Sequence, residues 1–136
     1  MLKLSRASHS AIGFCSATLL MAAIAQPVAA VEDGDFAFET TEELYHVCST
    51  DTADPNHASA QLACTAFTKA TVQYHDAVAD RKHLKRLICY PQGTSIANGQ
   101  TAFLAWAKQN AGNAKLMGEL PVVGLVRALA KAYPCK

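Results

Sequence analysis

The sequence predicts an all-α fold, a small bundle of four main helices stapled by disulfides after a cleaved signal peptide. The clearest helical pattern is the last one, in which Val122, Val126, Leu129 and Tyr133 recur at steps of four, three and four residues. Residues at these steps share one stripe of an α-helix. No stretch alternates apolar and polar residues as a half-buried strand does. After the leader the chain keeps four cysteines, and an even count in a short exported protein is typical of a disulfide framework.

The first 30 residues have the pattern of a signal peptide. Lys3 and Arg6 supply a positive region, and the apolar run at 11–25 that follows is short for a membrane span. Small residues offer two cleavage positions, after Ala25 or after Ala30, and the second is favoured because acidic residues follow it directly. We therefore expect a signal peptide at 1–30 and one exported domain at 31–136, located in the periplasm with no membrane association after cleavage.

The charge of the expected mature chain is close to neutral. The whole sequence has 12 Lys and Arg and 11 Asp and Glu, and Lys3 and Arg6 fall in the leader, which leaves 10 basic against 11 acidic residues. A nucleic-acid-binding protein needs a clear basic excess on one face. The balance therefore argues against nucleic acid as a partner.

Two helices are predicted in the first half of the mature chain. Thr40 and Glu43 have capping-box spacing at the start of the first helix, which ends near Ser49. Asp54 followed by Pro55 predicts the start of the second and longest helix, as an N-cap and a proline at the first helical position. The buried face of that helix is predicted to consist of Cys64, Phe67, Thr71, Tyr74 and Val78.

Two more helices are predicted in the second half. The basic cluster at 81–86 marks the end of the long helix, because positive charge complements the helix dipole there. Thr94 or Ser95 caps a third helix, which breaks at 110–113 because Asn and Gly accept the left-handed conformation. Pro121 opens the last helix. One side of the third helix is predicted to consist of Ile96, Gln100, Phe103 and Ala107, with Leu104 beside them and Gly99 weakening the pattern.

Cys48, Cys64, Cys89 and Cys135 allow three disulfide pairings. Metal binding is the rival interpretation, but the spacings of 16, 25 and 46 residues contain no close pair of the kind that zinc sites use. We favour Cys48 with Cys64, which closes a hairpin of the first two helices, and Cys89 with Cys135, which fastens the chain end. In the chain-entropy model the two loops contribute roughly 3 and 4 kcal/mol, so reduction is expected to unfold the domain.

No residue pattern predicts an enzyme, a metal site or a cofactor. The histidines lack the spacing of a helical metal pair, and the neighbours His75 and Asp76 are expected to point to different helix faces. No serine lies in a nucleophile elbow, and paired cysteines offer no thiolate. Carboxylates are crowded into the first 54 residues, which leaves no obvious acid and base pair.

Three features are candidates for binding a partner protein. The basic cluster at 81–86 suits an acidic surface, although a solvated helix end is the more ordinary interpretation. Trp106 lies off the apolar line of its helix and is either an interface anchor or a core residue. Leu116 and Met117 stand in a predicted loop, where apolar side chains are costly unless they pack inward or against a partner.

Two motifs in the C-terminal half carry a resemblance to a known family. Residues 89–94 read CYPQGT and residues 128–135 read ALAKAYPC. They resemble the C-x-P-x-G segment and the A-L-x-x-A-[FY]-P-C ending of the Rap/Tai family of type VI secretion immunity proteins. Cys48 and Cys64 fall where members place a cysteine on each of the first two helices. A glycine that often follows an aromatic residue after the second cysteine is absent here, and the resemblance covers about residues 40–135.

The resemblance implies a periplasmic protein, often a homodimer, that binds and blocks a peptidoglycan amidase delivered by other cells. It also implies a mechanism of occlusion, in which a protruding loop of the inhibitor enters the active-site cleft of the effector. By position that loop is 110–119 in this chain, with Leu116 and Met117 as its apolar tip. The expected partner-binding residues are Asn113, Lys115, Leu116, Met117 and Trp106.

A second function comes from a different class, the periplasmic chaperones and general interaction proteins. Small disulfide-linked helical acid chaperones share the size and layout predicted here. Such a chaperone exposes apolar surface when acidified. The near-neutral charge and ordinary polarity of this chain give that interpretation little support.

Overall fold

A computed structural model describes residues 30–136, and the all-α prediction is confirmed for this part of the chain. The predicted signal peptide lies outside the described residues, apart from its last position. Within 30–136 there are four main helices and no strand, although one isolated bridge joins Ile88 to Pro134. The elements are the 3-10 helix η1 (Asp33–Ala37) and the α-helices α1 (Thr41–Cys48), α2 (His57–Lys82), α3 (Ile96–Asn110), α4 (Ala114–Met117) and α5 (Pro121–Ala132).

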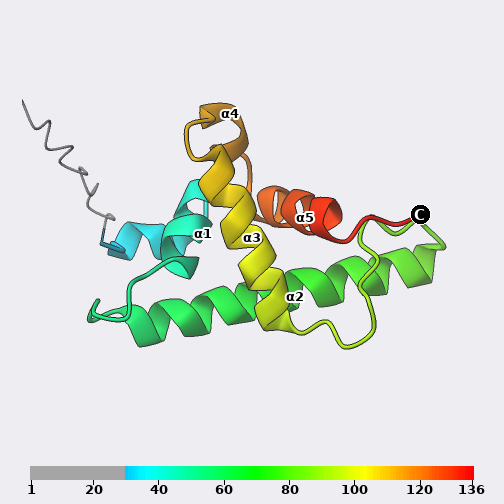
Figure 1. The fold of residues 1–136 in the computed structure, drawn as a ribbon, viewed down its shortest axis with the longest axis horizontal. Coiled ribbons are helices and arrows are strands. Elements are labelled where there is room, and N and C mark those ends of the chain that lie inside the picture. Colours follow the sequence, from blue (N-terminus) through cyan, green and yellow to red (C-terminus); the bar gives the residue numbers. More distant parts are fainter. Residues whose placement is uncertain (1–29) are drawn as a thin grey trace, which may run out of the picture.

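The long helix α2 forms the base on which the other helices are arranged. Figure 1 shows α3 crossing α2 steeply, with α1 and η1 on one side of α3 and α5 on the other. Helices α1, α3 and α5 all contact one another. The core lies between these three helices and α2, and its largest fully buried side chains include Leu44, Val47, Ile88, Phe103, Met117, Leu125 and Leu129.

The helix starts follow the predicted caps with one exception. The Thr40 hydroxyl accepts a hydrogen bond from the Glu43 N–H at 3.2 Å, as the capping-box pattern predicts. Of the two caps proposed for α3, Ser95 is the one used. The predicted start of α2 at Asp54 is wrong, because the Asp54 carboxylate instead accepts from the Asn56 N–H at 2.7 Å. This local turn delays the helix until His57.

The buried face of α2 is only partly the predicted one. Cys64 and Thr71 are buried as expected, but Tyr74 is 73% exposed. At 26 residues α2 is about 39 Å long. No neighbouring helix covers Tyr74, and only small or polar side chains are buried along the helix. These buried residues are Ala60, Cys64, Thr68, Thr71 and Ala79.

The predicted stripe of α5 is also rotated from the buried one. Leu129 is fully buried, but Val122 is 39% exposed and Val126 is only partly buried. The helix instead turns two leucines, Leu125 and Leu129, and the small residues Gly124 and Ala128 toward the interior. Its buried residues are Pro121, Gly124, Leu125, Ala128 and Leu129. Gly124 and Ala128 allow close packing against the neighbouring helices, and this orientation leaves Val122 and Val123 on the outer side.

Helix α3 is buried along part of the predicted side, since Phe103 and Ala107 are fully covered whereas Ile96 and Gln100 are only partly buried. Gly99 was expected only to weaken this helix. In the structure it is buried where α3 meets α2 and α5, with Leu129 and Thr68 as its nearest neighbours on those helices. The glycine therefore lies at a close helix crossing.

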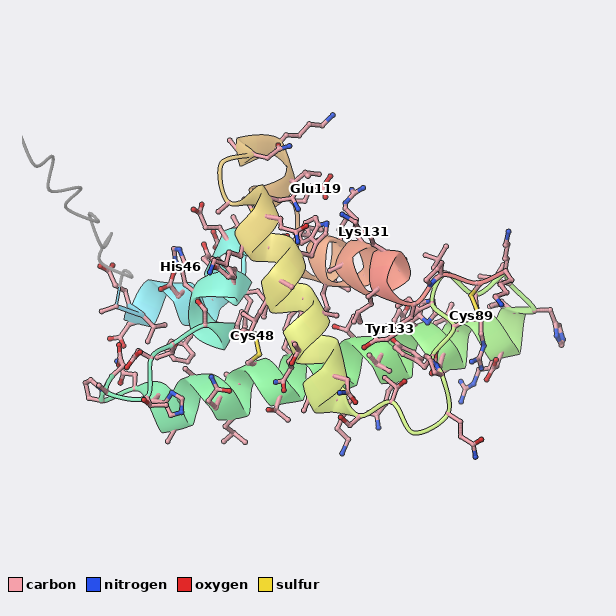
Figure 2. All side chains as sticks on the ribbon, viewed as in Figure 1. His46, Cys48, Cys89, Glu119, Lys131 and Tyr133 are labelled. Atoms are coloured by element: carbon pink, nitrogen blue, oxygen red, sulfur yellow. A yellow bond between two sulfur atoms is a disulfide. The ribbon has the colours of Figure 1, made fainter. Side chains whose placement is uncertain are left out.

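Both favoured disulfides are present. Cys48 is bonded to Cys64 and joins α1 to α2, and Cys89 is bonded to Cys135 and fastens the chain end. The second bond has backbone support, because the Cys89 N–H donates to the Tyr133 carbonyl at 2.9 Å. The segment after α2 and the segment after α5 are thus held side by side (Figure 2).

A close helix contact joins α1 to α5. Thr41 is fully buried, its N–H donates to the Glu119 carbonyl at 2.8 Å, and its hydroxyl lies 2.9 Å from the same oxygen. Gly124 faces the Thr41 side chain, and a methyl group on Gly124 would overlap it. The absence of a side chain at Gly124 is therefore what lets α1 and α5 approach.

Gly124→Ala is expected to destabilise the fold by about 1–3 kcal/mol, the usual cost of forcing a methyl group into a filled core. The direction of the change in stability is diagnostic, because alanine in a helix is otherwise favoured over glycine by about 1 kcal/mol. Urea unfolding of the oxidised protein measures the difference. Gly34→Ala is the control, since nothing lies near that position. Unchanged or increased stability in Gly124→Ala would contradict the close approach.

Candidate partner-binding surfaces

The connection between α3 and α5 is the region in which the sequence places the partner contact. It contains the four-residue helix α4, where a plain loop was predicted. Asn113 is structural in this turn, because its side-chain oxygen accepts from the Leu116 N–H at 3.2 Å and caps α4. Figure 1 shows α4 projecting beyond the end of α3, away from α2. The connection is therefore an ordered projection.

Of the predicted apolar tip of this projection, Met117 is turned inward and Leu116 only in part. Met117 is only 2% exposed and belongs to the core, and Leu116 is partly buried against the core. Trp106 is also buried, at 6% exposure, so the core interpretation of this residue holds. Leu116 and Met117 pack toward the core and thereby anchor this short connection. Asn113 and Lys115 are exposed, and partner binding by them stays a prediction.

The base of the projection is fixed by polar contacts. Nη2 of Arg127 lies 2.9 and 2.8 Å from the two carboxylate oxygens of Glu119. The Glu119 carbonyl accepts from Thr41 on α1. Glu119 therefore joins the end of the projection to both α5 and α1, and Figure 2 shows it at this junction. These contacts and the buried Met117 hold the projection to the body at its α5 end.

The structure also contains an apolar groove that the sequence analysis did not identify as a site. Two adjoining hollows of about 420 and 290 Å³ share Leu87, Val122 and Val126 between α2 and α5. Leu84 and Leu87 are each 57% exposed, although both are large apolar side chains. We call this surface the α2/α5 groove. Its apolar lining consists of Tyr74, Val78, Leu84, Leu87, Val122, Val123, Val126 and the alanines 79 and 130.

The segment that forms one wall of the groove is held in place from both sides. Ile88 is fully buried and next to the Cys89–Cys135 disulfide. On the α2 side, Nε2 of His75 accepts from the Leu87 N–H at 3.3 Å. Nδ1 of the same ring lies 2.9 Å from the Asp76 carboxylate, which assigns the proton to Nδ1. The prediction that His75 and Asp76 point apart is therefore wrong, since the two side chains are hydrogen-bonded.

Two sequence signals point to the α2/α5 groove in hindsight. Leu84 and Leu87 lie in and directly after the basic cluster at 81–86, where a merely solvated helix end has no need of leucine. The other signal is the predicted face of α2, which continues to Tyr74 and Val78 beyond the reach of the core. Neither signal identifies α5 as the other wall of the groove, because this helix lies more than 30 residues further along the chain.

Within residues 30–136 no three His, Cys, Asp or Glu side chains lie close enough to hold a metal ion. The Asp80 hydrogen bond, at 2.7 Å, raises the pKa of Arg86. Burial, reinforced by the charge of Asp76 and by Tyr133, raises the pKa of Tyr90 to about 12. The Tyr90 hydroxyl is buried without a hydrogen-bond partner among the described residues.

The described helices also include none that is long and apolar enough to cross a membrane. What the structure shows is a small disulfide-bonded helical protein with an ordered projection and an apolar groove on its surface. Comparison with known families identifies the class of protein more specifically than the fold does. The family model of the Rap1a immunity proteins matches residues 40–135.

This match covers most of the chain, so the protein belongs to the Rap1a immunity protein family, which confirms the resemblance found in the two motifs. Membership implies that the protein binds a partner effector protein. No curated protein and no solved structure gives a significant match.

The raised pKa of Tyr90 predicts a loss of stability in alkali. An unfolded tyrosine ionises near its ordinary pKa of about 10, whereas native Tyr90 keeps its proton up to about 12. The contribution of Tyr90 to the free energy of unfolding is therefore complete below pH 10 and is lost as the pH rises to about 12.

Tyr90→Phe should therefore lose stability less steeply than the parent over this pH range, as measured by urea unfolding at a series of pH values. It should be at least as stable as the parent at pH 7, because the hydroxyl that it removes has no hydrogen-bond partner. Tyr74→Phe, which changes an exposed tyrosine, should keep the parental pH dependence. If the free energy of unfolding fell equally steeply with pH in Tyr90→Phe and the parent, the raised pKa of Tyr90 would be contradicted.

Proposed function

We propose that this protein is a periplasmic immunity protein that binds a peptidoglycan amidase effector of type VI secretion and occludes its active site. The observation that carries the proposal is the family match over residues 40–135, which implies an effector partner. The amidase is the effector class that the resemblance of the two C-terminal motifs to the family implies.

The two disulfides support a location outside the cytoplasm. Cys48–Cys64 and Cys89–Cys135 include all four cysteines of residues 31–136. Disulfides of this kind form and persist in oxidising compartments such as the bacterial periplasm. The expected signal peptide at 1–30 is the matching export signal, and an effector that cuts peptidoglycan would act in the same compartment.

The projection between α3 and α5 is the element that we propose enters the cleft of the amidase. It stands out from the body (Figure 1), and its exposed residues include Asn113 and Lys115. Its conformation is set in advance by the Asn113 cap, the buried Met117 and the contacts of Glu119. A binding segment that is already ordered loses less conformational entropy on association, which favours tight inhibition.

The proposal predicts stoichiometric inhibition. Purified type VI peptidoglycan amidases, beginning with any encoded beside this gene, are titrated with the oxidised 31–136 protein while the hydrolysis of purified sacculi is followed. One member of the panel should lose its activity at an equimolar ratio. If none of the amidases is bound or inhibited, the amidase assignment is wrong. Equal binding of unrelated unfolded proteins would instead support the chaperone-like alternative.

Charge reversal tests the role of the projection in the same assay. Lys115→Glu should weaken binding to the inhibited amidase by about tenfold or more, since a reversed charge in an interface costs on the order of 1.4 kcal/mol or more. Lys69→Glu is the matched control, because Lys69 is an exposed lysine on α2. Inhibition that Lys115→Glu leaves unchanged would keep the function but exclude this part of the projection as a contact.

A further inference from the structure

The α2/α5 groove continues the surface of the projection. Three residues separate the end of α4 from the start of α5, and the start of α5 carries apolar side chains that face outward. Leu120 is 62% exposed, Val123 is 40% exposed, and Val122 lines the groove. A partner seated on the projection therefore reaches the groove across the start of α5.

The exposed apolar residues of the groove form a patch instead of being scattered. Tyr74 and Leu84 line the same hollow as Leu87, and Leu87 and Val122 line both hollows. These four side chains are between 39% and 73% exposed. Single exposed apolar residues are ordinary on a protein surface, whereas a contiguous hollowed patch marks a binding site.

The charge around the groove favours one kind of occupant. Residues 30–56 contain eight Asp and Glu and no Lys or Arg, whereas residues 57–136 contain ten Lys and Arg and only three Asp and Glu. All three of these carboxylates are engaged within the chain, Asp76 with His75, Asp80 with Arg86 and Glu119 with Arg127.

Three cations beside the groove have no carboxylate partner among the described residues, namely Arg81, Lys82 and Lys85. Lys85 lines the groove directly. Arg81 and Lys82 follow Val78 by three and four residues on α2, a spacing that places them on the same helix face as this groove residue. The groove therefore has an apolar floor and an unpaired basic rim.

This rim distinguishes between the possible occupants. A second copy of the chain, related by a two-fold axis through the groove, would bring the same basic rim against itself. Juxtaposed like charges disfavour such a pairing, whereas carboxylates on a different protein would complement the rim. The observations therefore favour a partner with an acidic border over a second copy.

We propose that the α2/α5 groove is a second docking surface for the effector and receives an apolar helix or loop bordered by carboxylates. This inference rests on the proposed function for the identity of the partner. The apolar floor supplies affinity by removing Leu84, Leu87 and Val122 from water. The basic rim steers the acidic partner and accelerates association at low salt.

The first test uses the amidase that the protein inhibits. Leu87→Glu should raise the Kd about tenfold or more, because it places a carboxylate against the acidic border. Leu62→Glu is the control, since Leu62 is 72% exposed on α2 and does not line the groove. The double variant Lys82→Glu/Lys85→Glu should slow association and reduce its salt dependence. Thermal unfolding of each variant verifies the fold. Unchanged affinity in Leu87→Glu, with inhibition intact, would overturn the groove assignment and leave the proposed function standing.

The second test does not depend on the amidase. Two short helical peptides with one leucine face are compared, one flanked by glutamates and the other by lysines, and binding is followed by chemical shifts of the protein amides. The glutamate peptide alone should shift groove residues, and Leu87→Glu should abolish the effect. No binding, or equal binding of both peptides, would overturn the inference. A dimer in sedimentation equilibrium that Leu87→Glu dissociates would overturn it in favour of a second copy.

Discussion

The contact between Thr41 and Gly124 is the constraint on which the rest of the arrangement depends. Thr41 donates to the Glu119 carbonyl, and its side chain fills the space that Gly124 leaves open on α5. A helix has a single orientation about its axis, so the choice of Gly124 as the inward residue also decides which residues face outward. Val122 and Val123 are therefore exposed because α1 packs against Gly124. The same contact fixes Glu119, where the projection returns to the body.

Features decided by local interactions could be predicted from the sequence, whereas features decided by contacts between distant residues could not. The Thr40 cap, the break after Asn110 and both disulfide pairings were predictable, since each depends on near neighbours or on the order of the helices. The orientation of α5 was not, because it is decided by Thr41, more than 80 residues away. Met117 was misassigned because a plain loop was predicted, whereas the short helix α4 turns this side chain into the core. The α2/α5 groove forms between two elements that are distant in the sequence, so the helical periodicity of either one alone could not predict it.

The two surfaces have different physical characters, and this difference suits them to different parts of one interface. The projection exposes polar residues such as Asn113 and Lys115 on an ordered turn, which suits a shape-dependent fit into a cleft. The α2/α5 groove exposes Leu84 and Leu87 beside unpaired cations, which suits apolar burial with electrostatic steering. The first turn of α5 lies between the two surfaces, so one partner can engage both.

The motifs that carry the family resemblance lie in the scaffold, apart from the projection. CYPQGT and ALAKAYPC meet at the Cys89–Cys135 disulfide and at the Cys89 to Tyr133 hydrogen bond, and Ile88, directly before the first motif, bridges to Pro134 in the second. Together these contacts hold Leu87 at the edge of the groove. The recognisable residues thus specify where the surfaces stand, whereas Lys115 and Val122 fall outside both motifs. A scaffold of this kind can keep its fold while its contact residues are fitted to a particular effector, which is why family membership alone identifies the type of partner but not its binding residues.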